Sequence, residues 1–142
     1  MNAFADLLSL APWLAGIGHF CGLIASVQVP SRLRWREELA GLSALNRKLM
    51  WTYGAFTLLT IVAFGTLTLL LHDEFLKRDR AAAALAAFIA VFWTARILVD
   101  AFYFEHADWP VGWQFRVGHA MLTTLFVALA GTYWAVVGWC LI

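Results

Sequence analysis

Four long apolar stretches dominate the hydrophobic pattern of this chain. They cover residues 7–29, 49–71, 81–104 and 111–141, and each contains at most two charged side chains. The hydrocarbon core of a bilayer is about 30 Å thick and takes about 20 apolar residues per helical crossing, so each stretch is long enough to span it. None of them alternates with the period of two that a β-barrel strand requires. The pattern therefore predicts an all-α integral membrane protein with four spans.

The segments between these stretches are short. They comprise residues 30–48, 72–80 and 105–110, which keep consecutive helices adjacent and antiparallel. We therefore expect residues 1–142 to form a single transmembrane domain, an up-down-up-down four-helix bundle. Asp6 precedes the first apolar run and no Lys or Arg does, so we interpret this run as a retained span rather than a secretory signal.

The first connecting segment has a pattern of its own. Its leucines, among them Leu33, Leu39 and Leu42, fall near helical spacing, and charged residues such as Arg36 lie between them. This favours a short amphipathic interfacial helix between spans 1 and 2, a solvated charged turn being the alternative. Ser43 is the predicted N-cap of the second span.

Basic residues predict the orientation of the bundle. The first loop holds five and the second three, while Arg116 adds one beside the third loop. Because cytoplasmic loops carry an excess of Lys and Arg, loops 1 and 3 should be cytoplasmic and both termini non-cytoplasmic. The basic residues of the first loop are Arg32, Arg34, Arg36, Arg47 and Lys48.

Composition excludes several classes of protein. The chain is 63% hydrophobic and 13% charged, against about 45–50% and about 25% in soluble domains. Its net charge of +1 and scattered basic residues argue against nucleic-acid binding. Cys21 and Cys140 lie in the first and last spans at different expected depths, so they predict no disulfide framework. The expected surroundings are the lipid bilayer, with a hydrophobic small molecule or a membrane-protein partner as further candidates.

Four polar side chains interrupt the spans at similar expected depths. Counted at 1.5 Å per residue from the cytoplasmic helix ends, His19 lies about 13 Å deep, Arg96 about 12 Å, His119 about 10 Å and Asp100 about 6 Å. Such residues are costly in a membrane and mark functional sites. We expect the first and fourth helices to be neighbours, with His19 facing His119. The alternatives are a buried Arg96–Asp100 tether and histidines that merely hydrogen-bond between packed helices.

Two imidazoles on facing helices are typical ligands of haem iron. The first hypothesis is therefore a membrane redox protein that binds b-type haem through His19 and His119. Arg96 would contact the propionates, and further aromatic side chains would line the pocket. The lining residues would be Tyr53, Trp93 and Tyr103, and the candidates for catalytic roles are Arg96, Asp100 and Tyr103.

The chain has a single histidine in a glycine-containing first span, followed by a basic loop. The segment Leu-Asn-Arg-Lys-Leu-Met-Trp follows at residues 45–51, and Phe115-Arg116 stands at the start of the fourth span. This layout resembles the HemJ family of four-helix membrane proteins. The resemblance implies haem b binding and oxidation of protoporphyrinogen IX, with His19 as the haem ligand. Arg96 stands in the region where the family has a functional lysine.

Two other hypotheses compete with haem. A non-haem enzyme acting on a lipid-like substrate would hold iron, zinc or manganese through mixed nitrogen and oxygen ligands. Its candidate metal ligands are His19, His119, Asp100, Glu105 and His106. Alternatively, the chain is a non-catalytic membrane subunit or assembly factor whose small-residue faces pack on larger partners.

Overall fold

A computed structural model of the chain describes residues 3–105, 107 and 110–142. The described part is helical and contains no strand. Four helices are long and apolar enough to cross a membrane. They are α1 (Ala3–Val27), α4 (Ala44–Leu70), α6 (Arg80–Phe102) and α7 (Trp113–Leu141). The prediction of an all-α membrane protein with four spanning helices is confirmed.

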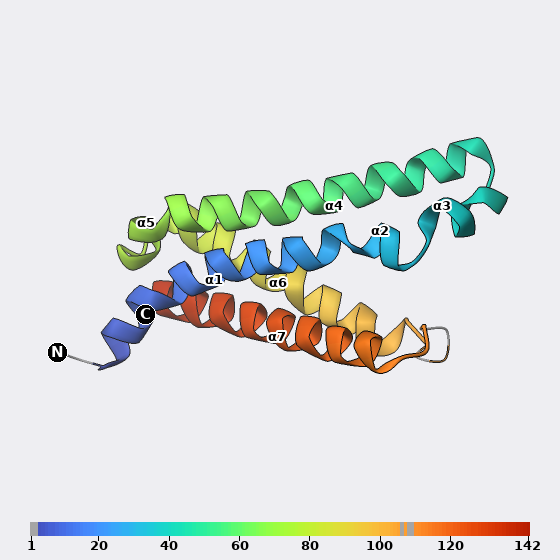
Figure 1. The fold of residues 1–142 in the computed structure, drawn as a ribbon. Helices are drawn as coiled ribbons and strands as arrows, with labels where there is room; N and C mark the ends of the chain where they lie inside the picture. The colour runs from blue at the N-terminus through green and yellow to red at the C-terminus, as the bar shows by residue number, and fades with distance from the viewer. Residues whose placement is uncertain (1–2, 106, 108–109) are drawn as a thin grey trace.

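The four helices run up, down, up and down (Figure 1). One end of the bundle, called here the first-loop end, carries the α1–α4 connection and the α6–α7 connection. The opposite end carries both termini and the short helix α5 (His72–Leu76). Helix α1 packs mainly on α4, and α6 packs mainly on α7. Helix α1 also contacts α7, so the expectation that the first and fourth helices are neighbours is confirmed.

Polar caps set where two of the helices begin. The Ser43 side chain accepts a hydrogen bond from the Asn46 backbone N–H at 3.3 Å, as predicted for an N-cap. The Asp79 carboxylate caps α6 and accepts from the backbone N–H groups of Ala81 and Ala82. Helix α4 thus starts five residues before the apolar stretch at 49–71, because hydropathy marks the membrane boundary whereas the cap marks the helix boundary.

The first loop folds differently from the expected single amphipathic helix. It forms three short turns, α2 (Val29–Arg32), α3 (Trp35–Glu38) and the 3-10 turn η1 (Leu39–Gly41). Arg34 separates α2 from α3 in a left-handed conformation with φ of 51°, and a continuous α-helix cannot pass through such a residue. The segment between spans 1 and 2 is thus helical, as predicted, but it consists of short pieces.

Helix α5 was not predicted from the sequence. Its Phe75 is buried against the bundle with 1% of its surface exposed. The His72 Nε2 atom lies 2.8 Å from the Ser9 carbonyl oxygen, and the imidazole packs on the Trp13 ring at 5.1 Å. These contacts tie α5 to the start of α1 at the end of the bundle that carries the termini.

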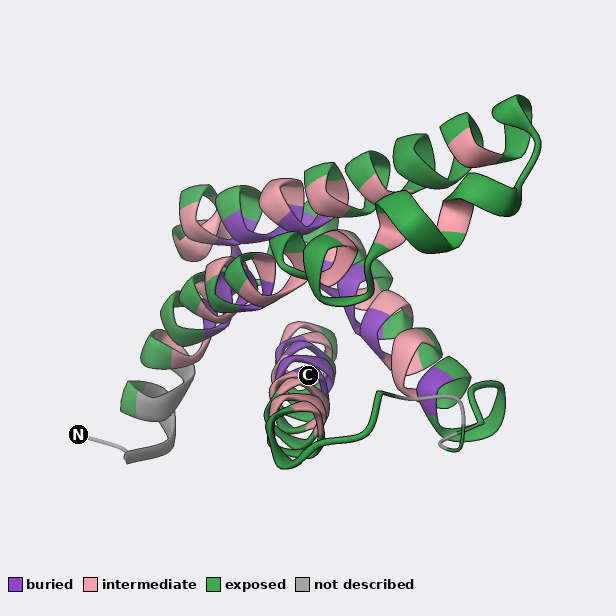
Figure 2. Cartoon of the chain, turned by 45° about the vertical axis from the view of Figure 1, so that its right-hand side comes forward, coloured by how far each residue is buried: buried purple, intermediate pink, exposed green. Residues whose placement is uncertain are grey.

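The buried residues lie along the inner faces of all four helices (Figure 2). Aromatic rings join α4 to α6, since Phe64 packs edge-on against Phe92 at 5.1 Å. Small residues let α1 approach α4 closely: a Cβ placed on Gly65 would lie 2.9 Å from the Phe20 ring. The core is therefore built from aromatic rings that join α4 to α6 and from side chains of α1 packed closely against Gly65 of α4.

Candidate functional site

His19 lies at the centre of the bundle and is fully buried. Its Nε2 atom accepts a hydrogen bond from the indole N–H of Trp93 at 3.0 Å. An indole nitrogen can only donate, so Nε2 carries no proton in this contact. Nδ1 then carries the proton and donates it to the Ala15 carbonyl oxygen at 2.8 Å. Both ring nitrogens of His19 are engaged with protein atoms.

A second hydrogen bond lies beside the first. The Thr68 hydroxyl donates to the Phe64 carbonyl oxygen at 2.7 Å, so it accepts from the Tyr133 hydroxyl, which lies 2.6 Å away. The Tyr133 ring lies 5.6 Å from the His19 ring. We call His19, Thr68, Trp93 and Tyr133 the inner cluster. Each of the four spanning helices contributes one of its members.

The inner cluster has the properties of a structural core. The four side chains are at most 2% exposed, and each side-chain nitrogen or oxygen named above has a hydrogen-bond partner. In a bilayer an unsatisfied polar group is expensive, so a fully paired network holds the four helices in one register. These hydrogen bonds alone explain why a histidine and a tyrosine lie inside a membrane span, and no ligand is needed to explain them.

Arg96, Asp100 and His119 form a separate charged triad nearer the first-loop end. The Asp100 carboxylate, 9% exposed, lies 3.4 Å from His119 Nε2 and 3.9 Å from Arg96 Nη1. The predicted pairing of Arg96 with Asp100 is thus present. At 3.9 Å that contact is too long for a hydrogen bond. Arg96 Nη1 is buried and has no hydrogen-bond acceptor among the described residues.

A large cavity opens beside the charged triad. It has a volume of about 1440 Å³ and is lined by α1, α6, α7 and the first loop. Arg96 and His119 lie in the wall of the cavity. Its other polar and aromatic lining residues are Gln28, Arg32, Trp35, Tyr103, Phe104, Glu105, Trp113, Gln114 and Phe115.

The cavity has a polar end and an apolar end. Arg32 and Glu105 lie toward the first-loop end, where α1 and α6 finish. Met121 and Leu125 line it from further along α7, and Cys21 lines it from α1. A cavity of this kind suits an amphipathic molecule whose charged groups lie at the membrane surface and whose body lies in the hydrocarbon region.

The structure separates the two histidines that the sequence analysis placed together. His19 bonds to Trp93 and His119 contacts Asp100, and these two α6 residues are seven positions apart. Seven residues of helix correspond to about 10 Å. Two metal–nitrogen bonds of about 2 Å each cannot bridge that separation. The structure therefore does not bring the His19 and His119 rings together, because each contacts a different residue of α6.

The other predicted site residues fall into four groups. Tyr103 and Glu105 line the cavity, as Arg96 and His119 do. Trp93 belongs to the inner cluster, not to the cavity wall. Tyr53 is 64% exposed on α4, a helix that contributes no residue to the cavity. His106 lies outside the described residues.

The candidate metal ligands do not gather at one point. Within residues 3–105, 107 and 110–142, no group of three or more His, Cys, Asp or Glu side chains is placed to hold a metal ion. Asp100 and His119 are together, while His19 is in the inner cluster.

Sequence reasoning missed several residues of both sites. Tyr133 and Thr68 complete the inner cluster, and Arg32 and Trp113 line the cavity. A signal for Tyr133 was present, since a tyrosine deep in a span needs a partner for its hydroxyl. Arg32 gave no such signal, because only the fold of the first loop brings it to the cavity.

Comparison with protein-family models, with curated proteins and with solved structures found no match for this chain.

Proposed function

We propose that the cavity binds an amphipathic, anionic molecule and that b-type haem is this molecule, which makes the chain a membrane redox protein. One observation carries the proposal: the Arg96 side chain lies in the cavity wall, and its Nη1 atom has an ion-pair contact with Asp100 at 3.9 Å but no hydrogen-bond acceptor among the described residues. Buried polar groups are nearly always hydrogen-bonded, so a cationic donor without an acceptor favours an anionic ligand. The carboxylates of a haem have the required charge.

The lining of the cavity fits such a molecule. Arg96 and Arg32 are the cations available to two propionates, and Trp35, Tyr103 and Trp113 offer flat apolar faces to a porphyrin ring. The volume of about 1440 Å³ exceeds the range of about 300–1,000 Å³ that is usual for small-molecule sites, so space is not limiting.

The lining of the cavity also changes which histidine would bind the haem iron. His19 does not suit ligation, because its two ring nitrogens are bonded to the Trp93 indole and the Ala15 carbonyl oxygen, and it does not line the cavity. His119 does line it, and Asp100 contacts its ring. A carboxylate next to a metal-binding imidazole orients the ring and raises its basicity. The proposal therefore assigns His119, and not His19, as the residue that would hold the haem iron.

A bound haem would supply one-electron chemistry, with a potential set by its ligand and by the polarity of the pocket. The residues of this chain would bind and orient the group. Asp100 holds the His119 ring, Arg96 balances the ligand's charge, and Met121 and Leu125 keep water from the apolar end. Oxidation of a porphyrinogen, as the HemJ resemblance implies, is a reaction class that the proposal accommodates.

The test is the absorption spectrum of the detergent-purified protein during titration with haem. We expect a Soret band for the wild type and for the His72→Ala control, which removes a histidine at the opposite end of the bundle. His119→Ala should lose or shift the band, whereas His19→Gln should keep it. A wild type that gives no Soret band refutes haem binding. A band that depends on His19 but not on His119 refutes the assigned ligand and supports the HemJ assignment instead.

A second candidate is a non-haem metal enzyme that acts on a lipid-like substrate. The contact between Asp100 and His119 favours it, because one carboxylate and one imidazole are a mixed donor pair suited to iron, zinc or manganese. Glu105 also lines the cavity. Elemental analysis of the purified protein distinguishes this candidate: it requires a stoichiometric metal in a preparation without a haem spectrum.

We further propose that the first-loop end faces the cytoplasm. Loops 1 and 3 both lie at this end and together carry more basic residues than the second loop. Reporter fusions to the C-terminus test the orientation, and activity of a cytoplasm-dependent reporter there would refute it.

A further inference from the structure

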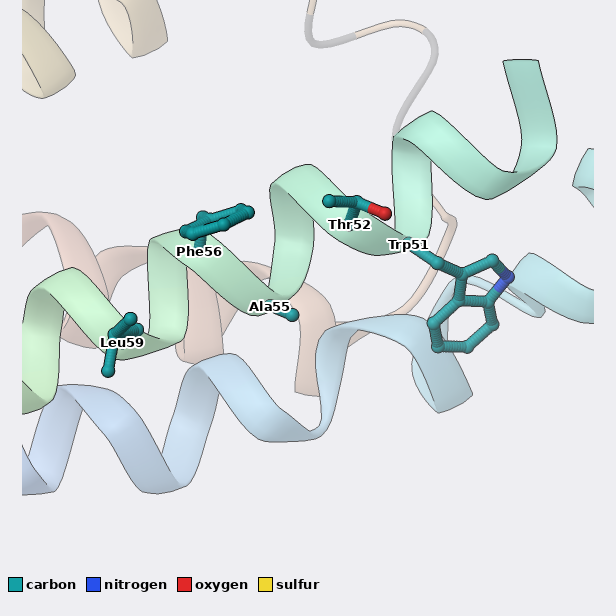
Figure 3. Close-up of a pocket in the computed structure, with 5 residues that line it drawn as sticks. All are labelled: Trp51, Thr52, Ala55, Phe56 and Leu59. Carbon is teal, nitrogen blue, oxygen red and sulfur yellow. The ribbon is translucent and has the colours of Figure 1, made fainter. Parts of the chain in front are cut away.

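A second hollow lies on the outer face of α4, apart from the cavity. It is a groove of about 380 Å³, lined by Trp51, Thr52, Ala55, Phe56 and Leu59 (Figure 3). All five lining residues belong to α4, and none of them lines the cavity. A molecule bound in the groove would therefore be distinct from the ligand of the proposed function.

The groove is a shallow apolar channel along the surface of the helix, open on its outer side. Thr52, Ala55 and Leu59 follow one another at helical spacing, so they share one face of α4. The small Ala55 forms the floor between the larger side chains of Trp51 and Phe56. From Trp51 to Leu59 the groove extends about 12 Å along the axis. The Thr52 hydroxyl donates to the Lys48 carbonyl oxygen at 2.9 Å, and apart from this hydroxyl and the Trp51 indole the lining is apolar, so the groove favours a hydrocarbon chain.

Positive charge lies at one end of the groove. Lys48 precedes Thr52 by one turn, on the same face, and is exposed. Residues 30–48 carry five basic side chains and two acidic ones. Of the five, Arg34 forms an ion pair with Glu37, and the structure records no other ion pair for them among the described residues. The charge at this end is therefore in excess and available to an anion.

A tryptophan pair marks this end as the membrane surface. The Trp35 ring packs edge-on against the Trp51 ring at 5.5 Å. A Cβ placed on Gly54 would lie 3.2 Å from the Trp35 ring, so the indole sits close against the α4 backbone. Tryptophans gather at the headgroup level of a bilayer. Lys48, one turn nearer the end of the helix than Trp51, then lies at the level of lipid phosphates.

From this arrangement we infer that the groove and Lys48 form a binding site for an anionic phospholipid. One acyl chain lies in the channel from Trp51 to Leu59, and the Lys48 ammonium contacts the phosphate. Charge complementarity selects the class of lipid, since the excess positive charge of the first loop attracts an additional negative headgroup. A zwitterionic lipid would fill the channel equally well but would gain less from this charge.

Native mass spectrometry of the protein released from nanodiscs tests the inference. The nanodiscs contain equal amounts of phosphatidylglycerol and phosphatidylcholine. We expect the wild type to retain one phosphatidylglycerol molecule in preference to phosphatidylcholine. Ala55→Phe, which fills the channel, should abolish retention, and Lys48→Gln should lower the preference by about fivefold. The matched controls are Ala128→Phe, at an exposed position on α7, and Lys77→Gln, at the other end of the bundle.

Three results would overturn the inference. The first is a wild type without a retained phospholipid. The second is retention that Ala55→Phe leaves unchanged, or that Ala128→Phe removes equally. The third is a dimer of the chain that Ala55→Phe disrupts, which would assign the groove to a second copy. Because neither variant touches the cavity, the haem titration of Ala55→Phe stays normal if the proposed function holds, so the two proposals fail separately.

Discussion

The hydrogen bond between His19 and Trp93 should contribute measurably to the stability of the bundle. His19→Leu removes the acceptor and leaves the Trp93 indole N–H buried without a partner. Trp93→Phe removes the donor and leaves the His19 Nε2 atom unpaired. The double variant leaves neither group orphaned. The two single substitutions should therefore destabilise the fold by more in sum than the double variant does.

The expected size of this coupling follows from the surroundings of the pair. A buried donor left unsatisfied costs about 1–3 kcal/mol. Measured couplings between helices in membranes average about 0.6 kcal/mol and reach about 1.7 kcal/mol. His19 and Trp93 are at most 2% exposed, and the bond is 3.0 Å long, so this pair belongs in the upper part of that range. We expect a coupling free energy of about 1–1.7 kcal/mol.

The assay is a double-mutant cycle on the free energy of unfolding, measured by pulse proteolysis in mixed micelles of dodecyl maltoside and SDS. Trp134→Phe is the matched control. It removes an indole hydrogen bond to Thr94 at 3.1 Å on the exposed rim, and the Thr94 hydroxyl keeps its own bond to the Ala90 carbonyl oxygen. No donor is orphaned there, so the loss should be smaller. A coupling between His19 and Trp93 below about 0.3 kcal/mol would refute the reasoning, since independent sites add within about that error.

Two further predictions concern the helices themselves. Gly65→Ala should destabilise the fold by about 1–3 kcal/mol, because its Cβ would lie 2.9 Å from the Phe20 ring, whereas Gly131→Ala, with open space around it, should cause no loss in the same proteolysis assay. Equal effects of the two substitutions would show that packing at Gly65 is not tight. Asp79→Ala should cost about 0.5–2 kcal/mol through loss of the α6 N-cap, and Asp79→Asn should restore most of it; no rescue by asparagine would argue against capping as the cause.

Much of the fold was readable from hydropathy, because lipid leaves a chain few options. Apolar runs of 23 residues or more must become helices, and short connections make neighbouring helices antiparallel. The N-cap at Ser43 was readable too, since a cap depends on a few adjacent residues. The three turns of the first loop were not: the left-handed conformation of Arg34 leaves no mark in a pattern of leucines.

The candidate site was readable only in part. The i,i+4 spacing brings Arg96 close to Asp100 whatever the other helices do, so that contact could be predicted. The contact of Asp100 with His119 depends on how far α7 is shifted along α6, which no local pattern records. For the same reason His19 was assigned to the wrong neighbours. If one helix moved two turns along its neighbour, the hydropathy of every span would be unchanged, so hydropathy does not predict which side chains meet.

The sequence by itself determined that the protein is a bundle of four membrane-spanning helices with polar side chains inside it, because burial in lipid acts on each residue separately. Only the tertiary structure decided which of those side chains are paired in the core and which line the cavity. Packing at Gly65 and the ring contacts of Phe64 set the level of each helix against the next. That level places His19 in a fully paired core and leaves Arg96 and His119 in the wall of a cavity, where a ligand can reach them.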